Sequence, residues 1–405
     1  MDNTIPSWLN ESFLVSALQG DSQERCVTVT DFSASPAVAA GNNYTSHLYR
    51  VVVEYKVGHA DKTEKKSLIV KMPIQKGVMH EMSQETDFFS KEPKMYNVLL
   101  PKMKKISGIK FGPKSFHCPV EKGMVIEDLK PEGYLLQDKF KQLDFEHCKL
   151  VMEKLGKFHA TTVVCHNDDS QFIETIGKEA FYKNDGVMAE FKIWMSSSMK
   201  IFINTLQEIK VDPAHIDLIT ARIDQLWDST AAICQPHTNS LNILNHGDCW
   251  SNNMLFKYND VGKVIDVMFI DFQLLRYSSP ITDILYFVYT SANEEVRENK
   301  LQDLYDLYLQ TLNDMLENLG CKDRMTREEF SEKLKSASDF VLVVIGTILP
   351  FTKCEAENAL DMESFDKDDV MHSNEDERIL RIYRSEQFRA MLPALVRQYS
   401  SFVSS

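Results

Sequence analysis

Apolar and polar residues alternate along much of the first 130 residues, a period of two that is typical of strands with one buried face. The pattern predicts three long strands and two short ones, at residues 25–32, 47–57, 66–72, 115–119 and 123–129. Between the third and the fourth strand, apolar residues recur every three or four positions, which predicts a helix from about residue 82 to residue 100. We expect this helix to stop at Pro101, because proline breaks a helix interior.

The pattern changes after Leu129. A turn-rich crossing (KPEG, residues 130–133) leads into helical spacing, and a strand-like island interrupts the helices at residues 243–275. The helical stretches are residues 145–162, 187–207, 212–234 and 297–319. The sequence therefore predicts an α+β chain of two lobes, a small β-rich N-lobe (1–129) and a large, mainly helical C-lobe (130–405). A nucleotide would bind in the cleft between them.

Charge and composition narrow the possible partners. The chain has 405 residues and a formal net charge of −14, which argues against a nucleic-acid partner, because binding a phosphate backbone needs a basic face. Eight cysteines are scattered without a CxxC pair, as is typical of free thiols in a reducing compartment. The first 20 residues lack the apolar stretch of a signal peptide, and the longest apolar run is about twelve residues, where a membrane span needs roughly 20. We expect a cytoplasmic protein with no nucleic-acid or membrane partner.

The strongest chemical signal is NHGDCWSNN (residues 245–253), followed by FIDFQ (269–273). Phosphoryl transfer needs a carboxylate at the attacking hydroxyl and oxygen ligands for magnesium. Asp248, then Asn253 five residues later, and Asp271 at the end of a short apolar strand have the spacing that kinases use for this purpose. We predict Asp248 as the base, with Asn253 and Asp271 as the metal ligands. Either motif alone could be an ordinary turn, but their joint spacing favours a catalytic site.

Upstream, Lys71 ends an apolar strand (LIVK), where a lysine needs a counter-charge and can reach the phosphates of ATP. A lysine at a sheet edge that extends to water is the alternative. Glu92 is the candidate partner, although a residue before proline resists helical geometry. Because proline is accepted in the first turn of a helix, the helix could begin at about Glu92. Glu85 is the alternative partner.

Two further segments are candidate nucleotide contacts. The loop between the first two strands contains Gly41, Asn42, Asn43, Tyr44 and Ser46, whose backbone amides and hydroxyl could cap the phosphates. An ordinary hairpin turn is the alternative for each of these residues. The strand VIEDL (residues 125–129) runs into the crossing, where the backbone of Glu127 and Leu129 could pair with the edge of adenine.

These motifs together resemble the ecdysteroid kinase-like proteins of arthropods. The residues that carry the resemblance are GNNYTS, IVKM, EPKMYNVLLP, VIEDL, NHGDCWSNN and FIDFQ, and the match runs from about residue 14 to the C-terminus. That family is similar to choline kinases and aminoglycoside phosphotransferases and has a protein kinase-like fold. The resemblance implies ATP and Mg²⁺ as cofactors, Asp248 as catalytic base, Asn253 and Asp271 as metal ligands, and Lys71 as a phosphate ligand.

Differences from protein kinases indicate the acceptor. Gly247 stands where an arginine would contact a phosphorylated activation loop, and Gln273 replaces the glycine of DFG. Only eleven residues separate Asp271 from Asp283, too few for a segment that docks a peptide. We expect the hydroxyl of a small molecule as the acceptor. A protein kinase and a catalytically inactive, ligand-binding relative are the rival classes, and the intact set of motif residues argues against the second.

Two regions could bind that acceptor. One is an apolar, sulfur-rich helical face that could hold a hydrophobic alcohol such as an ecdysteroid, with core packing as the alternative. Its residues are Met188, Phe191, Trp194, Met195, Met199 and Phe202. The other is the acidic segment 355–377, which we expect to be an exposed loop but which could serve a cationic, choline- or aminoglycoside-like acceptor if it folded over the cleft. Trp250 could contact either kind of acceptor, and we expect His246 and His159 to be structural.

Overall fold

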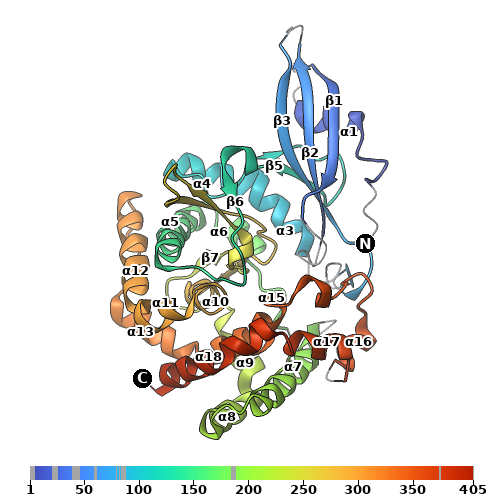
Figure 1. The fold of residues 1–405 in the computed structure, drawn as a ribbon. Coiled ribbons are helices and arrows are strands. Elements are labelled where there is room, and N and C mark those ends of the chain that lie inside the picture. The colour runs from blue at the N-terminus through green and yellow to red at the C-terminus, as the bar shows by residue number, and fades with distance from the viewer. Residues whose placement is uncertain are drawn as a thin grey trace.

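The computed structural model describes residues 5–20, 26–38, 46–58, 62–78, 80–81, 83, 88–183, 188–373 and 375–404. A small lobe built on an antiparallel sheet stands beside a larger lobe of packed helices (Figure 1). The sheet has the order β1-β2-β3-β5-β4, and helix α1 (Glu11–Gln19) packs against it. The strands are β1 (Val27–Pro36), β2 (Ser46–Val57), β3 (Glu64–Pro73), β4 (Ser115–Phe116) and β5 (Met124–Glu127).

The alternation along β3 decides which side chains face the large lobe. Leu68 and Val70 are fully buried in the core that the sheet shares with α1. Because successive side chains of a strand point to opposite faces, Ile69 and Lys71 point the other way, and both line the cavity between the lobes. The strand pattern predicted from the sequence thus delivers Lys71 to that cavity.

The helix that follows β3 differs from the prediction. It is continuous through α3 (Phe88–Lys94), a π-helical turn η1 (Met95–Leu99) and α4 (Leu100–Ser107). The expected stop at Pro101 is wrong, and so is a start at about Glu92, since Pro93 lies inside α3. The π-turn widens the hydrogen-bond spacing immediately before Pro101. This proline therefore occupies the first turn of α4, where no backbone N–H is required.

The large lobe contains two small sheets and most of the helices. Strand β6 (Tyr134–Leu135) pairs with β8 (Met254–Tyr258), which pairs with β9 (Val264–Phe269), and β7 (Ile243–Asn245) pairs with β10 (Arg276–Ser278). The longer helices are α5 (Phe145–Asp168), α7 (Met188–Glu208), α10 (Ile281–Ser291), α12 (Leu301–Asn318), α13 (Arg327–Ser336) and α18 (Glu386–Ser404). The shorter helices are α6 (Ser170–Ile176), α8 (Pro213–Thr220), α9 (Leu226–Ile233), α11 (Glu294–Asn299), α14 (Ser338–Val343), α15 (Leu349–Thr352), α16 (Lys367–Met371) and α17 (Glu377–Tyr383).

Two predicted helices are each divided in the structure. Residues 212–234 form α8 and α9 with the 3₁₀ turn Ile223–Gln225 between them, and the stretch 297–319 is divided between α11 and α12 at Lys300. The apolar periodicity continues across such a break because the helices on either side of it bury the same face. The sequence pattern alone therefore does not reveal the break.

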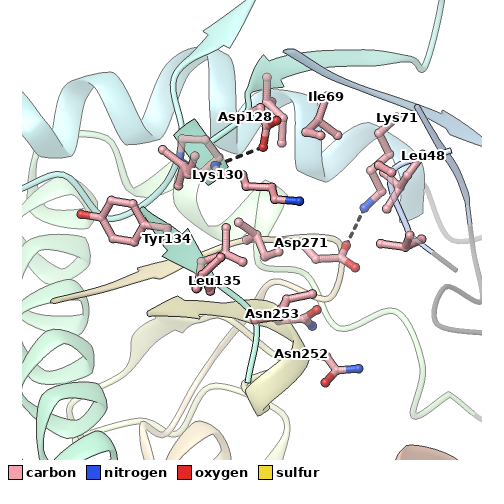
Figure 2. A pocket seen from close by; sticks show the side chains of 18 of the residues that line it. Leu48, Ile69, Lys71, Asp128, Lys130, Tyr134, Leu135, Asn252, Asn253 and Asp271 are labelled. Atoms are coloured by element: carbon pink, nitrogen blue, oxygen red, sulfur yellow. Dashed lines mark hydrogen bonds and ion pairs between the residues drawn. The ribbon is translucent and has the colours of Figure 1, made fainter. Parts of the chain in front are cut away.

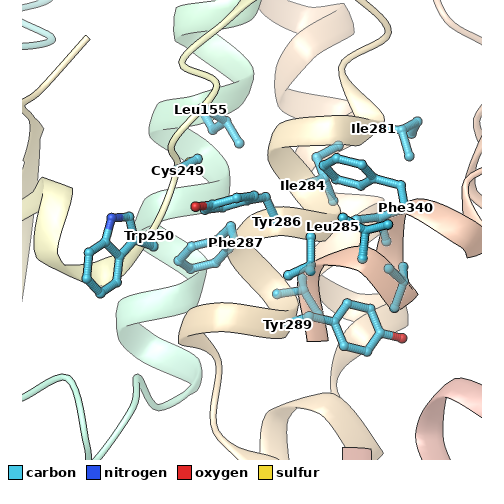
Figure 3. Packing of buried hydrophobic residues seen from close by; sticks show 14 of the residues in the cluster. Leu155, Cys249, Trp250, Ile281, Ile284, Leu285, Tyr286, Phe287, Tyr289 and Phe340 are labelled. Atoms are coloured by element: carbon cyan, nitrogen blue, oxygen red, sulfur yellow. The ribbon is translucent and has the colours of Figure 1, made fainter. Parts of the chain in front are cut away.

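Helix α10 lies at the centre of the large lobe, and all eleven of its residues are buried. Leu285, Phe287 and Tyr289 pack among the surrounding helices, while Tyr286 lies towards Cys249 and Trp250 of the neighbouring loop (Figure 3). Helices α13 and α14–α15 meet the length and composition of a membrane span only as a pair, bent by 51°. No single helix within the described ranges is long and apolar enough to cross a bilayer.

The acidic segment 355–377 is more ordered than the expected exposed loop. It contains the 3₁₀ turn Ala356–Asn358 and α16, whose first turn is closed by a reciprocal capping box between Asp366 and Asp369. It also contacts the small lobe, where the carbonyl of Phe365 accepts the N–H of Val78 at 2.8 Å, and Glu363 lies 3.2 Å from the ring of His47.

Candidate active site

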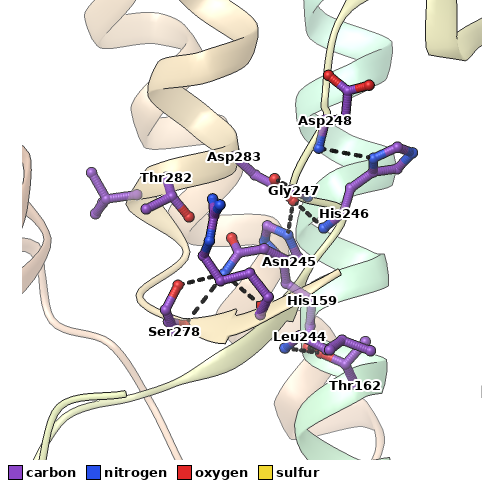
Figure 4. A network of polar contacts seen from close by, with 12 residues as sticks. His159, Thr162, Leu244, Asn245, His246, Gly247, Asp248, Ser278, Thr282 and Asp283 are labelled. Atoms are coloured by element: carbon purple, nitrogen blue, oxygen red, sulfur yellow. Dashed lines mark hydrogen bonds and ion pairs between the residues drawn. The ribbon is translucent and has the colours of Figure 1, made fainter. Parts of the chain in front are cut away.

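The loop that carries Asp248 connects β7 to β8 and is anchored by α10 (Figure 4). The carboxylate of Asp283 accepts the backbone N–H groups of His246 at 2.6 Å and Gly247 at 2.8 Å, and lies 3.1 Å from His159 Nε2. Burial would raise the pKa of Asp283, but the hydrogen bond and charge of His159, with these N–H groups, hold it below its usual value. One buried carboxylate therefore fixes the backbone just before Asp248.

Gly247 is required by the shape of this loop. Its φ is +82°, a left-handed conformation that favours glycine. A Cβ built at this position would lie 1.8 Å from the carbonyl oxygen of Leu274. The absence of an arginine here thus has a steric cause in addition to the missing activation segment.

His246 is held in one neutral tautomer. Its Nε2 lies 2.9 Å from the carbonyl oxygen of Ile270, so this nitrogen carries the proton, while Nδ1 accepts the N–H of Asp248 at 3.3 Å. Both ring nitrogens are therefore engaged with the backbone. His159 is fully buried between Tyr308 and Asp283. The expectation that both histidines are structural is confirmed.

Asp248 faces the cavity with both oxygens oriented by neighbours. The hydroxyl of Tyr286 donates to Oδ1 at 2.7 Å, and the side-chain amide of Asn253 donates to Oδ2 at 2.7 Å. Burial, followed by the negative charge of Asp271, raises the pKa of Asp248, and these two hydrogen bonds oppose that rise. A carboxylate with a raised pKa binds a proton more readily than a solvated one, as a general base requires.

Lys71 contacts two carboxylates, Glu92 of the small lobe and Asp271 of the large lobe. Its Nζ lies 2.8 Å from Glu92 Oε2 on α3 and 2.5 Å from Asp271 Oδ1, which follows β9 (Figure 2). Burial alone would lower the pKa of Lys71, but the charges of Asp271 and Glu92 outweigh it and raise the pKa. The pKa of Glu92 is raised chiefly by burial. The predicted pair of Lys71 with Glu92 is confirmed, and Glu85 lies outside the described residues.

The backbone at Asp271 is arranged to present its carboxylate. Asp271 has a φ of +66°, and its N–H donates to the hydroxyl of the buried Tyr96 at 3.2 Å. A left-handed conformation at a residue other than glycine costs energy and is often found at functional sites. The turn after β9 therefore directs Asp271 towards Lys71 and the cavity.

Asn253 and Asp271 fit a divalent cation. The amide nitrogen of Asn253 donates to both the carbonyl and the carboxylate of Asp248, which leaves its Oδ1 for a cation, and Asp271 uses only Oδ1 for Lys71. Magnesium prefers such oxygen ligands and commonly binds one or two protein groups together with phosphate oxygens.

A cavity of about 690 Å³ contains these groups. Leu48 and Ile69 from the small lobe and Leu255 and Ile270 from the large lobe line it, and could enclose a flat base. Along the predicted adenine edge, the N–H of Glu127 donates to Lys114, and the carbonyl of Leu129 accepts from Glu132 and Tyr134. The N–H of Glu127 and the carbonyl of Leu129 are therefore already engaged, and pairing of adenine with this edge stays a prediction.

The phosphate-capping loop is only partly described. Gly41, Asn42, Asn43 and Tyr44 lie outside the described residues. Ser46 is buried at the start of β2, opposite Pro73 on β3 and two positions from the pair that Leu48 forms with Lys71. This loop's contact with phosphate stays a prediction.

Neither predicted acceptor region lines the cavity. Met199 is buried against Gly346, Trp194 packs on Phe351 with ring centroids 5.5 Å apart, and none of the six residues of that apolar face lies among the lining residues. An acceptor wall on α7 is wrong for this cavity, since the apolar face is core packing, the alternative that the sequence left open. No described residue of the acidic segment lines the cavity either.

Sequence reasoning missed four residues that shape the site. They are Tyr96, Asp283 as the anchor of the loop, Tyr286, and Arg50, which pairs with Asp128 at 2.7 Å beside the adenine edge. Asp283 and Tyr286 lie three positions apart in an apolar run. Because buried polar groups need hydrogen-bond partners, their position on one face of a buried helix could have indicated a role near the site. Arg50 and Tyr96 carried no comparable signal.

Comparisons with known proteins agree with this geometry. The family model described as "Ecdysteroid kinase-like family" matches residues 40–321, and the chain belongs to this family. No curated protein matches the chain. Among solved structures, it is similar to a choline kinase from Cryptosporidium parvum Iowa II, with 15% identity over 99% of this chain and 97% of that chain and a TM-score of 0.41.

Two further structures are similar at comparable levels. Choline kinase LicA from Streptococcus pneumoniae shows 12% identity over 92% of this chain and 97% of that chain, with a TM-score of 0.38. Amicoumacin kinase hAmiN, solved with AMP-PNP, Ca²⁺ and Ami, shows 14% identity over 89% of each chain, with a TM-score of 0.44. The predicted family is confirmed by the family model, and the predicted α+β fold of two lobes is confirmed by the structure.

Proposed function

We propose that this protein transfers the γ-phosphate of ATP to a hydroxyl of a small molecule, using Asp248 as base. The observation that carries the proposal is the convergence of Lys71 on β3, Asp248 and Asn253 in the β7–β8 loop, and Asp271 after β9 on one cavity. Phosphoryl transfer requires three kinds of group: a carboxylate for the hydroxyl, oxygen ligands for a cation and an ammonium group for the phosphates.

Each residue has a distinct task in this scheme. Lys71, held by Glu92 and Asp271, contacts the phosphates, while Asn253 and Asp271 hold magnesium, which when bound offsets phosphate charge. Asp248 orients the acceptor hydroxyl and takes its proton as the oxygen forms a bond to the γ-phosphorus and the bond to ADP breaks. Tyr286 and Asn253 keep the carboxylate aimed while this happens.

The acceptor is a small molecule in this proposal because α10 begins at Ile281, soon after Asp271, and leaves no room for a peptide-docking segment. The family description favours a hydrophobic alcohol such as an ecdysteroid. A cationic acceptor is the alternative, since choline kinases are among the similar structures. We propose the cytoplasm as its location, because that compartment supplies MgATP and keeps the eight free cysteines reduced.

A phosphorylation screen tests this function. The protein is incubated with ATP, magnesium and a panel of small alcohols, and each alcohol is analysed by mass spectrometry for the gain of one phosphate. We expect at least one product, absent without magnesium and absent with Asp248→Asn. If no alcohol gains phosphate while MgATP still binds, the protein is the inactive, ligand-binding relative.

Binding of ATP provides a second test that needs no acceptor. We expect ATP to raise the melting temperature clearly with magnesium and only slightly without it, because phosphates and Asp271 repel each other when no cation lies between them. Equal shifts in the two conditions would contradict the assignment of Asn253 and Asp271 as metal ligands.

A further inference from the structure

One wall of the cavity belongs neither to the adenine region nor to the phosphate region. It is formed by the loop after β6 and by the residues that follow Asp248, and we call it the loop wall. Its members are Leu136, Gln137, Lys139, Phe140, Trp250 and Asn252. Because an acceptor hydroxyl must come within hydrogen-bond distance of Asp248, the body of the acceptor has to lie against the surfaces that flank this carboxylate.

The carboxylates of the cavity are already engaged elsewhere. Among the described lining residues, Glu92 pairs with Lys71, Glu127 with Lys110 at 2.8 Å, and Asp128 with Arg50. Asp248 and Asp271 serve the chemistry. The loop wall itself contributes no described carboxylate, and its one charged member is Lys139. At the loop wall itself, a cationic acceptor would therefore meet an ammonium group and no lining carboxylate.

Lys139 is fixed in place by the C-terminal part of the chain. Its Nζ donates to the carbonyl of Cys354 at 2.9 Å and lies 5.2 Å from the ring centroid of Phe140. Behind it, the buried Lys353 donates to the backbone carbonyl of Lys139. Among the described residues, neither lysine lies within ion-pair distance of a carboxylate. Glu355 is close enough to attract Lys139, and its Oε1 accepts a hydrogen bond from Ser385 at 2.8 Å.

The rest of the loop wall is mainly apolar. Phe140 and the largely buried Trp250 are its aromatic members, Leu136 is 46% exposed, and Gln137 and Asn252 supply neutral polar groups. An apolar ligand surface with a few fixed polar groups is typical of sites for small organic molecules. A quaternary ammonium group would instead be favoured by an aromatic cage without a competing cation.

We propose that the loop wall is the acceptor subsite and that it selects hydrophobic alcohols without positive charge, with Lys139 donating to a carbonyl or carboxylate oxygen of the acceptor. This inference rests on the proposed kinase function. It places the acceptor on the loop after β6 rather than on α7 or the acidic segment.

A matched set of three alcohols tests the charge selection. Cholate, its methyl ester and its aminoethyl amide share one hydroxylated skeleton and carry a negative, no, and a positive charge. Binding of each to the full-length protein saturated with magnesium and AMP-PNP is measured by calorimetry. Because like charges a few ångströms apart repel strongly at a partly buried site, we expect the amine to bind about tenfold more weakly than the ester and the carboxylate.

Variants assign the effect to Lys139. Lys139→Met should bring the three affinities to within about threefold of each other, and Lys139→Glu should make the amine the tightest ligand, because the sign of the local charge decides the order. Lys141→Met is the matched control, since Lys141 is an exposed lysine of the same loop that does not line the cavity, and should leave the order unchanged.

Three outcomes would overturn the proposal: equal binding of the amine by the wild-type protein, an unchanged order in Lys139→Met, or binding of none of the three. The magnesium-dependent shift with ATP is measured in parallel. If that shift persists, only the acceptor subsite is wrong. If the wild-type protein lacks it, the proposed kinase function fails as well.

Discussion

The two ends of the cavity are built in different ways. At the phosphate end, Lys71 contacts two carboxylates, and both oxygens of Asp248 accept hydrogen bonds from side chains. At the loop wall, Lys139 has a single side-chain hydrogen bond, to a backbone carbonyl, and its neighbours are mainly apolar. The first end is defined by mutual contacts among charged groups, and the second by the path of one loop.

This difference determines how each end of the cavity responds to amino-acid substitution. Removing one member of the phosphate end leaves a buried charge without its partner, which is costly. At the loop wall, a substitution changes shape or charge without breaking a network. We therefore expect the chemistry to tolerate few substitutions and the acceptor to be variable. The four experiments below test the residues around Asp248 and the two regions that do not line the cavity, α7 and the acidic segment.

The largest effect is expected for Asp248→Asn. Loss of the base should lower turnover about 10²- to 10⁴-fold, while the affinity for MgATP stays within a few-fold, because Asp248 is not assigned a contact with the nucleotide. Steady-state kinetics and calorimetry measure the two quantities. Asp271→Asn is the contrasting variant and should weaken binding of MgATP as well. Near-normal turnover of Asp248→Asn would remove Asp248 as the base.

Met199→Ala should act on stability alone. Met199 is fully buried against Gly346, so its truncation should lower the free energy of unfolding by about 2–5 kcal/mol. The KM for the acceptor should stay unchanged, since α7 does not line the cavity. Denaturant unfolding and kinetics test both statements, with the exposed neighbour Lys200→Ala as a control that should change stability by less than about 0.5 kcal/mol. A raised KM in Met199→Ala would restore α7 as an acceptor wall.

Tyr286→Phe should move the pH dependence of turnover. The hydroxyl of Tyr286 stabilises the charged form of Asp248, so its removal raises the pKa of Asp248 further. Because the base must be ionised, the acidic limb of the kcat profile should shift to higher pH. A hydrogen bond to a charged group contributes about 1.5–3 kcal/mol, which corresponds to about one to two pH units. An unshifted limb would mean that another group controls it.

The smallest effect is expected when Asp366, Asp368 and Asp369 are all replaced by asparagine. These residues cap α16 or lie within it, and they do not line the cavity, so kcat and KM for an uncharged acceptor should change by less than about twofold. Asparagine also serves as an N-cap, which limits the loss of stability. A strong fall in turnover would instead tie the acidic segment to the acceptor.

The sequence by itself determined the two-lobed fold and the four side chains, Lys71, Asp248, Asn253 and Asp271, that meet in the cavity. Spacing was sufficient for Asp248, Asn253 and Asp271 because they lie on one short β-rich island, and strand alternation was sufficient for Lys71 because period two fixes the face of a side chain. Glu92 was recognisable as a nearby charge that could offset Lys71.

Only the tertiary structure decided which residues line the cavity and which belong to the core. The pattern on α7 is the same whether its apolar face covers a ligand or a core, and the approach of Gly346 to Met199 settles it as core packing. Lys139 reaches the cavity because Cys354, far along the chain, accepts its hydrogen bond. Such contacts depend on how segments far apart in the sequence pack against each other. This packing produces no periodic pattern in the sequence, so the sequence alone does not predict it.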